Sequence, residues 1–274
     1  MTPTDSHAAP LPSVLYVYLS DESLCFARYE PRGRTEFLFA PWPTKPHVPL
    51  VTNLREAIAG IDFLHELPAR IDVLVDTPVT LVPMNDFQEE YCKEMYDFCF
   101  TEELSRCVFY DTLPCANAVL LFALNETVCR VLSDVFGDVY YTCVQTHVLR
   151  HWAEQSIIPA PGRKMLWAHL HGHEADLAVF DGRRLLMANR YDTQTSNDVA
   201  YYVLNVMQHT GMEPATDIVQ ITGNYELCSQ TAALLGEYVK DVRIPDPAKE
   251  FHEHIVSTTP DVPYGLMAAL AGAC

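Results

Sequence analysis

Three histidines at alternate positions are the residues whose types and spacing most directly suggest chemistry. His169, His171 and His173 lie in the stretch LWAHLHGHEAD, and Glu174 and Asp176 follow them. Residues two apart in a strand share a face, so the first two histidines could bind Zn²⁺ or Ni²⁺, with a carboxylate completing the shell. The alternative is that they are polar residues at a turn and at the end of a strand that faces a cleft.

The rest of the sequence adds no support for a metal centre. The chain has no HExxH motif and no closely spaced pair of cysteines, and we therefore expect no bound metal. A metal-dependent hydrolase nevertheless stays open as one hypothesis of function, beside the two that are given at the end of this section. Both interpretations of the histidines predict that their side chains line a cleft.

The nine cysteines do not resemble nucleophiles. They are scattered without a CxxC pair, and their contexts, such as DFCF, RCVF, PCAN and ELCS, do not resemble a nucleophile site. We expect buried free thiols in a reducing cytosol, and hence a cytoplasmic protein. The paired carboxylates in QEEY and TEEL have the spacing of a solvated helix face. The sequence therefore predicts no catalytic residue.

The charge of the chain argues against two classes of partner. A formal net charge of −18 over 274 residues repels phosphate backbones and anionic membranes, so we expect neither nucleic-acid binding nor membrane insertion. No apolar run approaches the roughly 20 residues of a membrane span. The opening MTPTDSHAAPLPS lacks the basic and apolar regions of a secretory signal, and residues 1–12 are predicted to form a disordered tail.

The histidines lie in the second copy of a repeated pattern. Residues 13–40 and 164–190 each contain three apolar strands with a Gly-containing turn before the third. A helical pattern follows at about 50–66 and about 195–209, and then a buried strand, RIDVLVD or DIVQIT. The order β-β-β-α-β thus occurs twice, at an offset of about 150 residues.

Between the copies, a compact βαβ unit is predicted at about residues 105–150. Its helix, NETVCRVLSDVFG, has Asn125 as its expected N-cap and ends at Gly137. SIIPAPGRK is the expected linker between a first lobe, residues 13–158 with this insert, and a second lobe, residues 163–274. VPYGLMAALAGAC is predicted to be a small-residue helix that packs back on a lobe.

A duplicated β-β-β-α-β lobe facing a central cleft resembles the actin-like ATPase superfamily, of ribonuclease H-like type. That superfamily includes sugar kinases and Hsp70-type chaperones. LAVFDGRRLLMANRYDTQTSNDVAYYV is similar to the matching segment of its pilus-assembly and cell-division branch, and IVQITGNYE resembles the turn that holds adenosine. The overall layout most resembles an uncharacterised bacterial family with this fold. The resemblance implies an α/β fold.

The resemblance implies a nucleotide cleft that has lost its motifs. The second phosphate loop of the superfamily has the form D-x-G-G-G-T-x-D. When residues 169–176 are aligned with it, His169 takes the carboxylate position and His171 a glycine position, and Gly172 is the one glycine of the motif that is kept. Glu174 takes a hydroxyl position, where its charge would face the γ-phosphate. Like charges about 4 Å apart repel by several kcal/mol at an effective dielectric near 20.

The other two nucleotide loops of the superfamily are also altered. In the first phosphate loop, Tyr18 takes the carboxylate position and Ser20 the glycine position, while Asp21 would face phosphate. At the adenosine turn, Gly223 is kept and Asn224 replaces the second glycine. The resemblance therefore implies eight residues of a degenerate nucleotide cleft. They are Ser20, Asp21, His169, His171, Gly172, Glu174, Gly223 and Asn224.

The resulting hypothesis is a non-catalytic, cytoplasmic adaptor or scaffold that binds another protein and uses no cofactor, neither ATP nor Mg²⁺. The alternative is a divergent nucleotide-dependent ATPase or kinase of the same fold. A cleft plugged by Glu174, His171 or Tyr18 would exclude a nucleotide. An open cleft with Gly172 and Gly223 facing each other would leave nucleotide binding possible.

Overall fold

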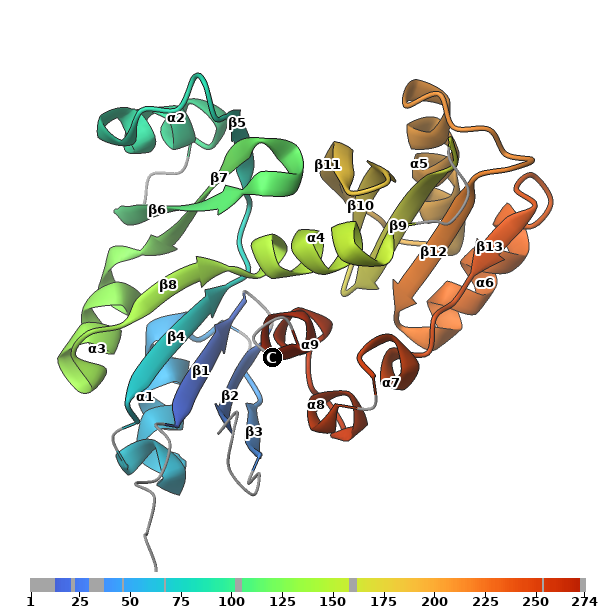
Figure 1. Cartoon of the computed structure of the whole chain (residues 1–274). Helices are drawn as coiled ribbons and strands as arrows, with labels where there is room; N and C mark the ends of the chain where they lie inside the picture. Colours follow the sequence, from blue (N-terminus) through green and yellow to red (C-terminus); the bar gives the residue numbers. More distant parts are fainter. Residues whose placement is uncertain are drawn as a thin grey trace, which may run out of the picture.

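The computed structural model describes most of the chain, and Figure 1 shows how its helices and strands are arranged. The described residues are 13–20, 23–29, 37–45, 47–66, 68–101, 105–157, 162–252 and 254–271. The predicted tail at residues 1–12 lies outside them, and so does Asp21.

The first sheet has five strands in the order β3-β2-β1-β4-β8. Strand β2 is antiparallel to both β1 and β3, whereas β4 runs parallel to β1 and β8 parallel to β4. The bounds are β1 Val14–Leu19, β2 Leu24–Tyr29, β3 Leu38–Trp42, β4 Arg70–Val75 and β8 Tyr140–Cys143. Helix α1 (Leu50–Gly60) and the 3-10 helix η1 (Asp62–His65) connect β3 to β4.

The second sheet repeats this topology, with the order β11-β10-β9-β12-β13. Its first three strands are antiparallel, and β12 is parallel to β9 and to β13. The bounds are β9 Lys164–His171, β10 Glu174–Asp181, β11 Arg184–Asp192, β12 Ile218–Gly223, β13 Asp241–Arg243, α5 Ser196–His209 and α6 Tyr225–Leu235. The predicted α/β class and the repeated β-β-β-α-β order are confirmed. We call each sheet with its helices a lobe.

A third sheet, the insert sheet, has the order β5-β7-β6 and lies at the upper left of Figure 1. The elements of this region are β5 Thr80–Pro83, η2 Glu89–Tyr91, α2 Cys92–Cys99, β6 Arg106–Leu113, η3 Pro114–Ala116, β7 Ala118–Asn125 and α3 Glu126–Phe136. Helix α3 begins and ends as predicted, because Asn125 accepts a hydrogen bond from the Thr127 N–H and Gly137 has a φ of +76°.

The structure divides the segment predicted as a βαβ insert differently. Strand β8 belongs to the first sheet, where it pairs with β4, and β5, which precedes residue 105, belongs to the insert sheet. An apolar run shows that a strand is buried but does not show which strand it pairs with. The lobe limits at 13–158 and 163–274 stay a prediction.

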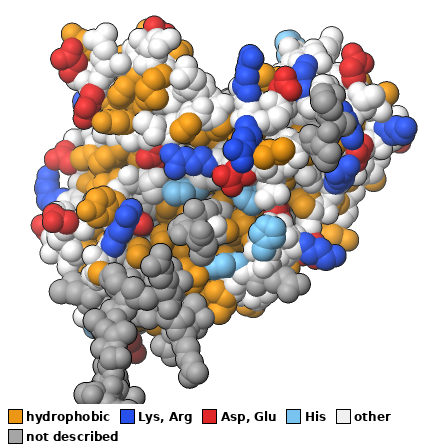
Figure 2. Space-filling view, in the orientation of Figure 1, with side chains coloured by type: hydrophobic (Ala, Val, Ile, Leu, Met, Phe, Trp, Pro, Cys, Tyr) orange, Lys and Arg blue, Asp and Glu red, His pale blue; other side chains and the backbone are white. Residues whose placement is uncertain are grey.

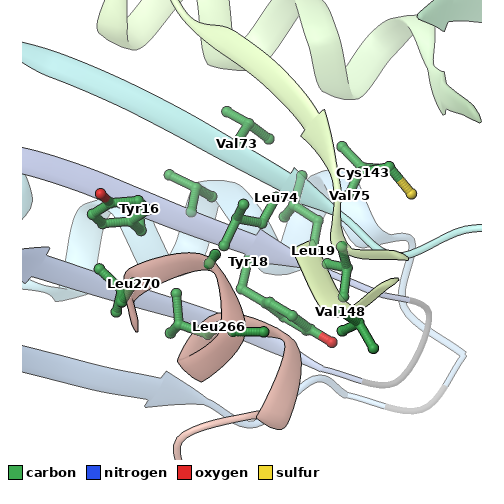
Figure 3. Packing of buried hydrophobic residues seen from close by; sticks show 14 of the residues in the cluster. Tyr16, Tyr18, Leu19, Val73, Leu74, Val75, Cys143, Val148, Leu266 and Leu270 are labelled. Atoms are coloured by element: carbon green, nitrogen blue, oxygen red, sulfur yellow. The ribbon is translucent and has the colours of Figure 1, made fainter. Parts of the chain in front are cut away.

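Two helices, α4 and α9, pack together in the core that the lobes share. Helix α4 (Val144–Gln155) follows β8, and α9 (Tyr264–Ala271) packs against it after the short helices α7 (Pro247–Glu250) and α8 (Ile255–Thr258). A Cβ on Gly265 would lie 2.3 Å from Cγ1 of Val144, so this small residue permits the close approach. In Figure 3, Leu266 and Leu270 of α9 point toward the tyrosines of β1. The predicted C-terminal helix thus packs on the first lobe.

The two lobes share a hydrophobic core. One cluster of buried residues includes the first sheet, α4, α9 and one face of the second sheet. At the junction, the rings of Trp152 in α4 and Trp167 in β9 stack with centroids 5.6 Å apart. The opposite face of the second sheet packs under α5 and α6. Within the described part of the chain, no helix is both long enough and apolar enough to cross a bilayer.

Candidate functional site

A cavity of about 430 Å³ lies where the two lobes meet. The carboxyl ends of parallel β1 and β4 reach it from the first lobe, and those of β9 and β12 reach it from the second. Six of the eight predicted residues line it, together with Tyr18. The six are Ser20, His169, His171, Gly172, Gly223 and Asn224. The topology therefore brings together residues that are about 200 positions apart in the chain.

Two predicted residues do not join this lining. Asp21 lies outside the described residues, so its position is not assigned. Glu174 does not line the cavity, and its carboxylate lies 3.2 Å from Nη1 of Arg190. Its charge is thus paired with a neighbouring guanidinium, and the expectation that Glu174 faces a phosphate site stays a prediction.

The dominant feature of the site is an ionic network around Arg190, which we call the Arg190 network. Arg190 donates from Nε to Asp176 Oδ1 at 2.6 Å and from Nη2 to Asp176 Oδ2 at 3.0 Å. Nη2 also donates to Oδ1 of Asp76 at 2.9 Å. Asp176 and Arg190 belong to the second sheet and Asp76 follows β4 of the first, so this guanidinium joins the two lobes.

Strand register explains how the network forms. Asp176 of β10 is directly opposite Arg190 of β11 and His169 of β9, and His169 is directly opposite Thr222 of β12. Side chains that are opposite each other in a sheet lie on the same face and within reach of one another. Four strands thus present one row of polar side chains to the first lobe.

Asp176 is the most fully hydrogen-bonded residue of the network. Besides Arg190, it accepts from Nε2 of His171 at 2.9 Å and from Nε2 of Gln145, on α4, at 2.5 Å. Burial alone would raise the pKa of Asp176, but the hydrogen bonds from His171 and Arg190 and their charges hold it well below its usual range. The carboxylate therefore stays ionised at neutral pH.

The charges on the other members follow from the same contacts. Burial opposes the charged form of both His171 and Arg190, but Asp176 outweighs it and raises the pKa of each. Tyr18 donates its hydroxyl to Asp76 at 3.1 Å, and burial together with that carboxylate raises its pKa well above the usual value. Tyr18 is therefore a neutral hydrogen-bond donor.

The three histidines have different roles. Burial lowers the pKa of His169 to about 3, and its neutral ring stacks between His171 and Tyr264, with Nδ1 3.1 Å from Oγ1 of Thr222. His171 is ion-paired with Asp176, and His173 is exposed on the turn. No group of three or more potential ligands in the described chain is placed to hold a metal ion.

Gly223 and Asn224 have structural roles. A Cβ on Gly223, whose φ is +116°, would lie 2.0 Å from the carbonyl oxygen of Leu170 in β9. Asn224 is the N-cap of α6, where its side chain accepts from the Leu227 N–H. Packing of β12 against β9 and the start of α6 thus explain both residues without a bound nucleotide.

The lining offers little to a magnesium nucleotide. The two carboxylates at the cavity, Asp76 and Asp176, are already ion-paired with Arg190, so neither is free to hold a divalent cation. Among the described residues that line the cavity, none is a lysine or arginine that could face phosphate. These residues do not fit Mg²⁺ and a triphosphate.

Several residues of the site were not among the predicted eight, including Arg190 and Asp176 of the Arg190 network. Asp76 follows the buried strand RIDVLV, a position where polar residues reach the edge of a parallel sheet, so its place in the sequence carried a usable signal. Gln145 and Tyr264 are on helices that reach the cavity only through the arrangement of the lobes.

The sequence matches a protein family described as "Protein of unknown function (DUF3822)" over residues 10–242, and the chain belongs to this family. No curated protein matches the sequence.

Two solved structures are similar in fold. The first is a Bacteroides thetaiotaomicron protein with an actin-like ATPase fold and unknown function; at 19% identity the match covers 91% of this chain and 97% of that one, with a TM-score of 0.80. The second is the PilM–PilN type IV pilus biogenesis complex, at 10% identity, 95% and 98% coverage and a TM-score of 0.58. The resemblance to the actin-like ATPase fold is confirmed.

Removing the guanidinium of Arg190, which Asp76 and Asp176 share, should destabilise the protein strongly. Arg190→Met leaves the mostly buried carboxylates of Asp76 and Asp176 without their shared guanidinium. Such a change typically lowers the free energy of unfolding by about 3–5 kcal/mol. Arg243→Met, which breaks an exposed pair with Asp241, should change stability by about 0–1 kcal/mol. Urea unfolding of both variants measures the difference, and equal effects would contradict the role given to Arg190.

The contribution of His171 should depend on pH. Its folded-state pKa is raised, so its stabilisation is fully present below the unfolded pKa of about 6.5 and is lost as pH rises through the folded value. The difference in unfolding free energy between the wild type and His171→Gln should therefore shrink from pH 6 to pH 9. A difference that grows over this interval would show that the ion pair with Asp176 does not form.

Gly223 should tolerate no side chain. Gly223→Ala places a methyl group against the backbone of β9, and we expect a loss of at least about 3 kcal/mol. Gly182→Ala is the matched control, because Gly182 also has a positive φ but open space around it, and should cost about 1–2 kcal/mol. Chemical denaturation of the two variants makes the comparison, and similar losses would refute the packing explanation.

Proposed function

We propose that this chain is a non-catalytic protein of the actin-like ATPase fold that acts as an adaptor by binding another protein. The observation that carries the proposal is the position of Arg190 between Asp76 and Asp176. A guanidinium that joins carboxylates from both lobes supplies within the chain the positive charge that a bound cation would otherwise supply. The cleft then serves to hold the lobes together.

The insert supports a protein-binding role. Its exposed large apolar side chains include Met84, Tyr91, Phe98 and Tyr110. Phe98 on α2 is 90% exposed, and Tyr91, in the 3-10 helix η2 that directly precedes α2, is 49% exposed. Exposed apolar side chains that gather on one region of a surface are typical of protein interfaces. Figure 2 shows hydrophobic side chains over the insert at its upper left.

The comparison with PilM–PilN gives independent support, because that structure is a complex of two proteins and shares this fold. We infer that a partner of this chain contacts the insert. We also infer a cytoplasmic location, from the free thiols and the acidic surface.

A nucleotide-dependent ATPase or kinase remains the rival function, since a cavity of about 430 Å³ is within the roughly 300–1,000 Å³ of small-molecule sites. Calorimetric titration of the full chain with ATP and Mg²⁺, together with a phosphate-release assay, separates the two functions. We expect no saturable heat at micromolar concentration and no phosphate release. Saturable binding that requires Mg²⁺, or turnover of ATP, would overturn the non-catalytic assignment.

The partner contact is tested by affinity capture from the native cell with quantitative mass spectrometry. The same protein should be recovered with the wild type and with Tyr238→Glu, a control at an exposed tyrosine of the second lobe. Its recovery should fall at least about tenfold with Phe98→Glu, because a charge replaces an apolar contact. Equal recovery with both variants would remove the insert from the interface.

A further inference from the structure

Two cysteines of the insert lie side by side beneath a surface cavity. Cys107 of β6 is directly opposite Leu124 of β7, and Sγ of Cys129, on α3, lies 4.0 Å from the Leu124 carbonyl oxygen. Burial and, after it, the nearby Cys107 thiol raise the pKa of Cys129. A helix residue and a strand residue, 22 positions apart, therefore pack against the same residue of β7.

Both thiols can be reached from solvent through the same opening. Cys107 and Cys129 line a cavity of about 700 Å³, whose wall also includes Tyr141 and the exposed Arg130. Cys107 is half-buried, whereas Cys129 is buried. The other described cysteines include the exposed Cys99, which does not line this cavity.

We propose that Cys107 and Cys129 form a reversible modification site, at which a disulfide compound such as oxidised glutathione converts the two thiols into an intramolecular disulfide. The cavity admits the oxidant, and both cysteines line it. The product would tie α3 to β6 within the insert.

The order of the two steps follows from burial. The Cys107 thiolate attacks one sulfur of glutathione disulfide, which releases one glutathione thiolate and leaves a mixed disulfide. The Cys129 thiol then loses its proton and attacks the Cys107 sulfur, which releases the second glutathione. Two protein thiols are oxidised and one glutathione disulfide is reduced. Burial raises the pKa of Cys129 to about 12, so Cys129 is the slow, second thiol.

The test treats the native full chain with oxidised glutathione, blocks remaining thiols with N-ethylmaleimide and maps the peptides by mass spectrometry. We expect one linked peptide joining Cys107 to Cys129, and a higher midpoint of thermal unfolding that dithiothreitol reverses. Cys99→Ser, the matched control, should give the same linked peptide and the same shift.

Two variants separate the steps. Cys107→Ser should abolish both the linked peptide and the thermal shift, and Cys129→Ala, which keeps the site apolar, should trap glutathione on Cys107. Alkylation of Cys107 and Cys129 after oxidation, or a disulfide that joins Cys107 to any other cysteine, would overturn the proposal. Because every readout concerns the insert thiols, failure here would leave the adaptor proposal unaffected.

Discussion

The structure depends on one guanidinium group that is shared by carboxylates from opposite lobes. Arg190 is 23% exposed, and its partners Asp76 and Asp176 are 11% and 9% exposed, so all three charges have lost most of their contact with water. A buried charge is tolerated only when its hydrogen bonds are completed by partners of good geometry. Asp176 meets this condition with bonds from Arg190, His171 and Gln145.

The hydrophobic core supports the same arrangement. The stacked rings of Trp152 and Trp167 join α4 to the second sheet, and Trp152 Nε1 donates to the hydroxyl of Tyr264 on α9. Opening the lobes would therefore expose apolar surface and break the ion pairs at once. A fold in which two lobes meet at a cleft is here held closed by its own side chains, which is consistent with a scaffold.

The repeated topology could be predicted from sequence because central strands such as VLYVYL carry strong local signals. The helix of the insert could be predicted from its caps, Asn125 and Gly137. The residues of the cavity could be predicted only through a resemblance, which placed six of eight at one site. The roles of these residues could not be predicted from the sequence. Gly223 looked like a remnant of an adenosine turn, whereas its lack of a Cβ is explained by contact with Leu170.

The Arg190 network shows why such roles escape prediction. If β10 and β11 paired regularly from the turn at Gly182 onward, Asp176 would be opposite Asn189. A shift of register between Val179 and Phe180 puts it opposite Arg190 instead. A bulge of one residue decides which side chain reaches the carboxylate, and nothing in LAVFDGRRLL marks it. The contact with Asp76 further requires the lobes to be in place.

A double-mutant cycle between Asp76→Asn and Arg190→Met tests the central claim most directly, because it measures the coupling of two charges that only the closed lobes bring together. Equilibrium unfolding of the wild type, both single variants and the double variant should give a coupling energy of at least about 1 kcal/mol. A coupling near zero would show that the guanidinium does not join the lobes in solution, and would contradict the account.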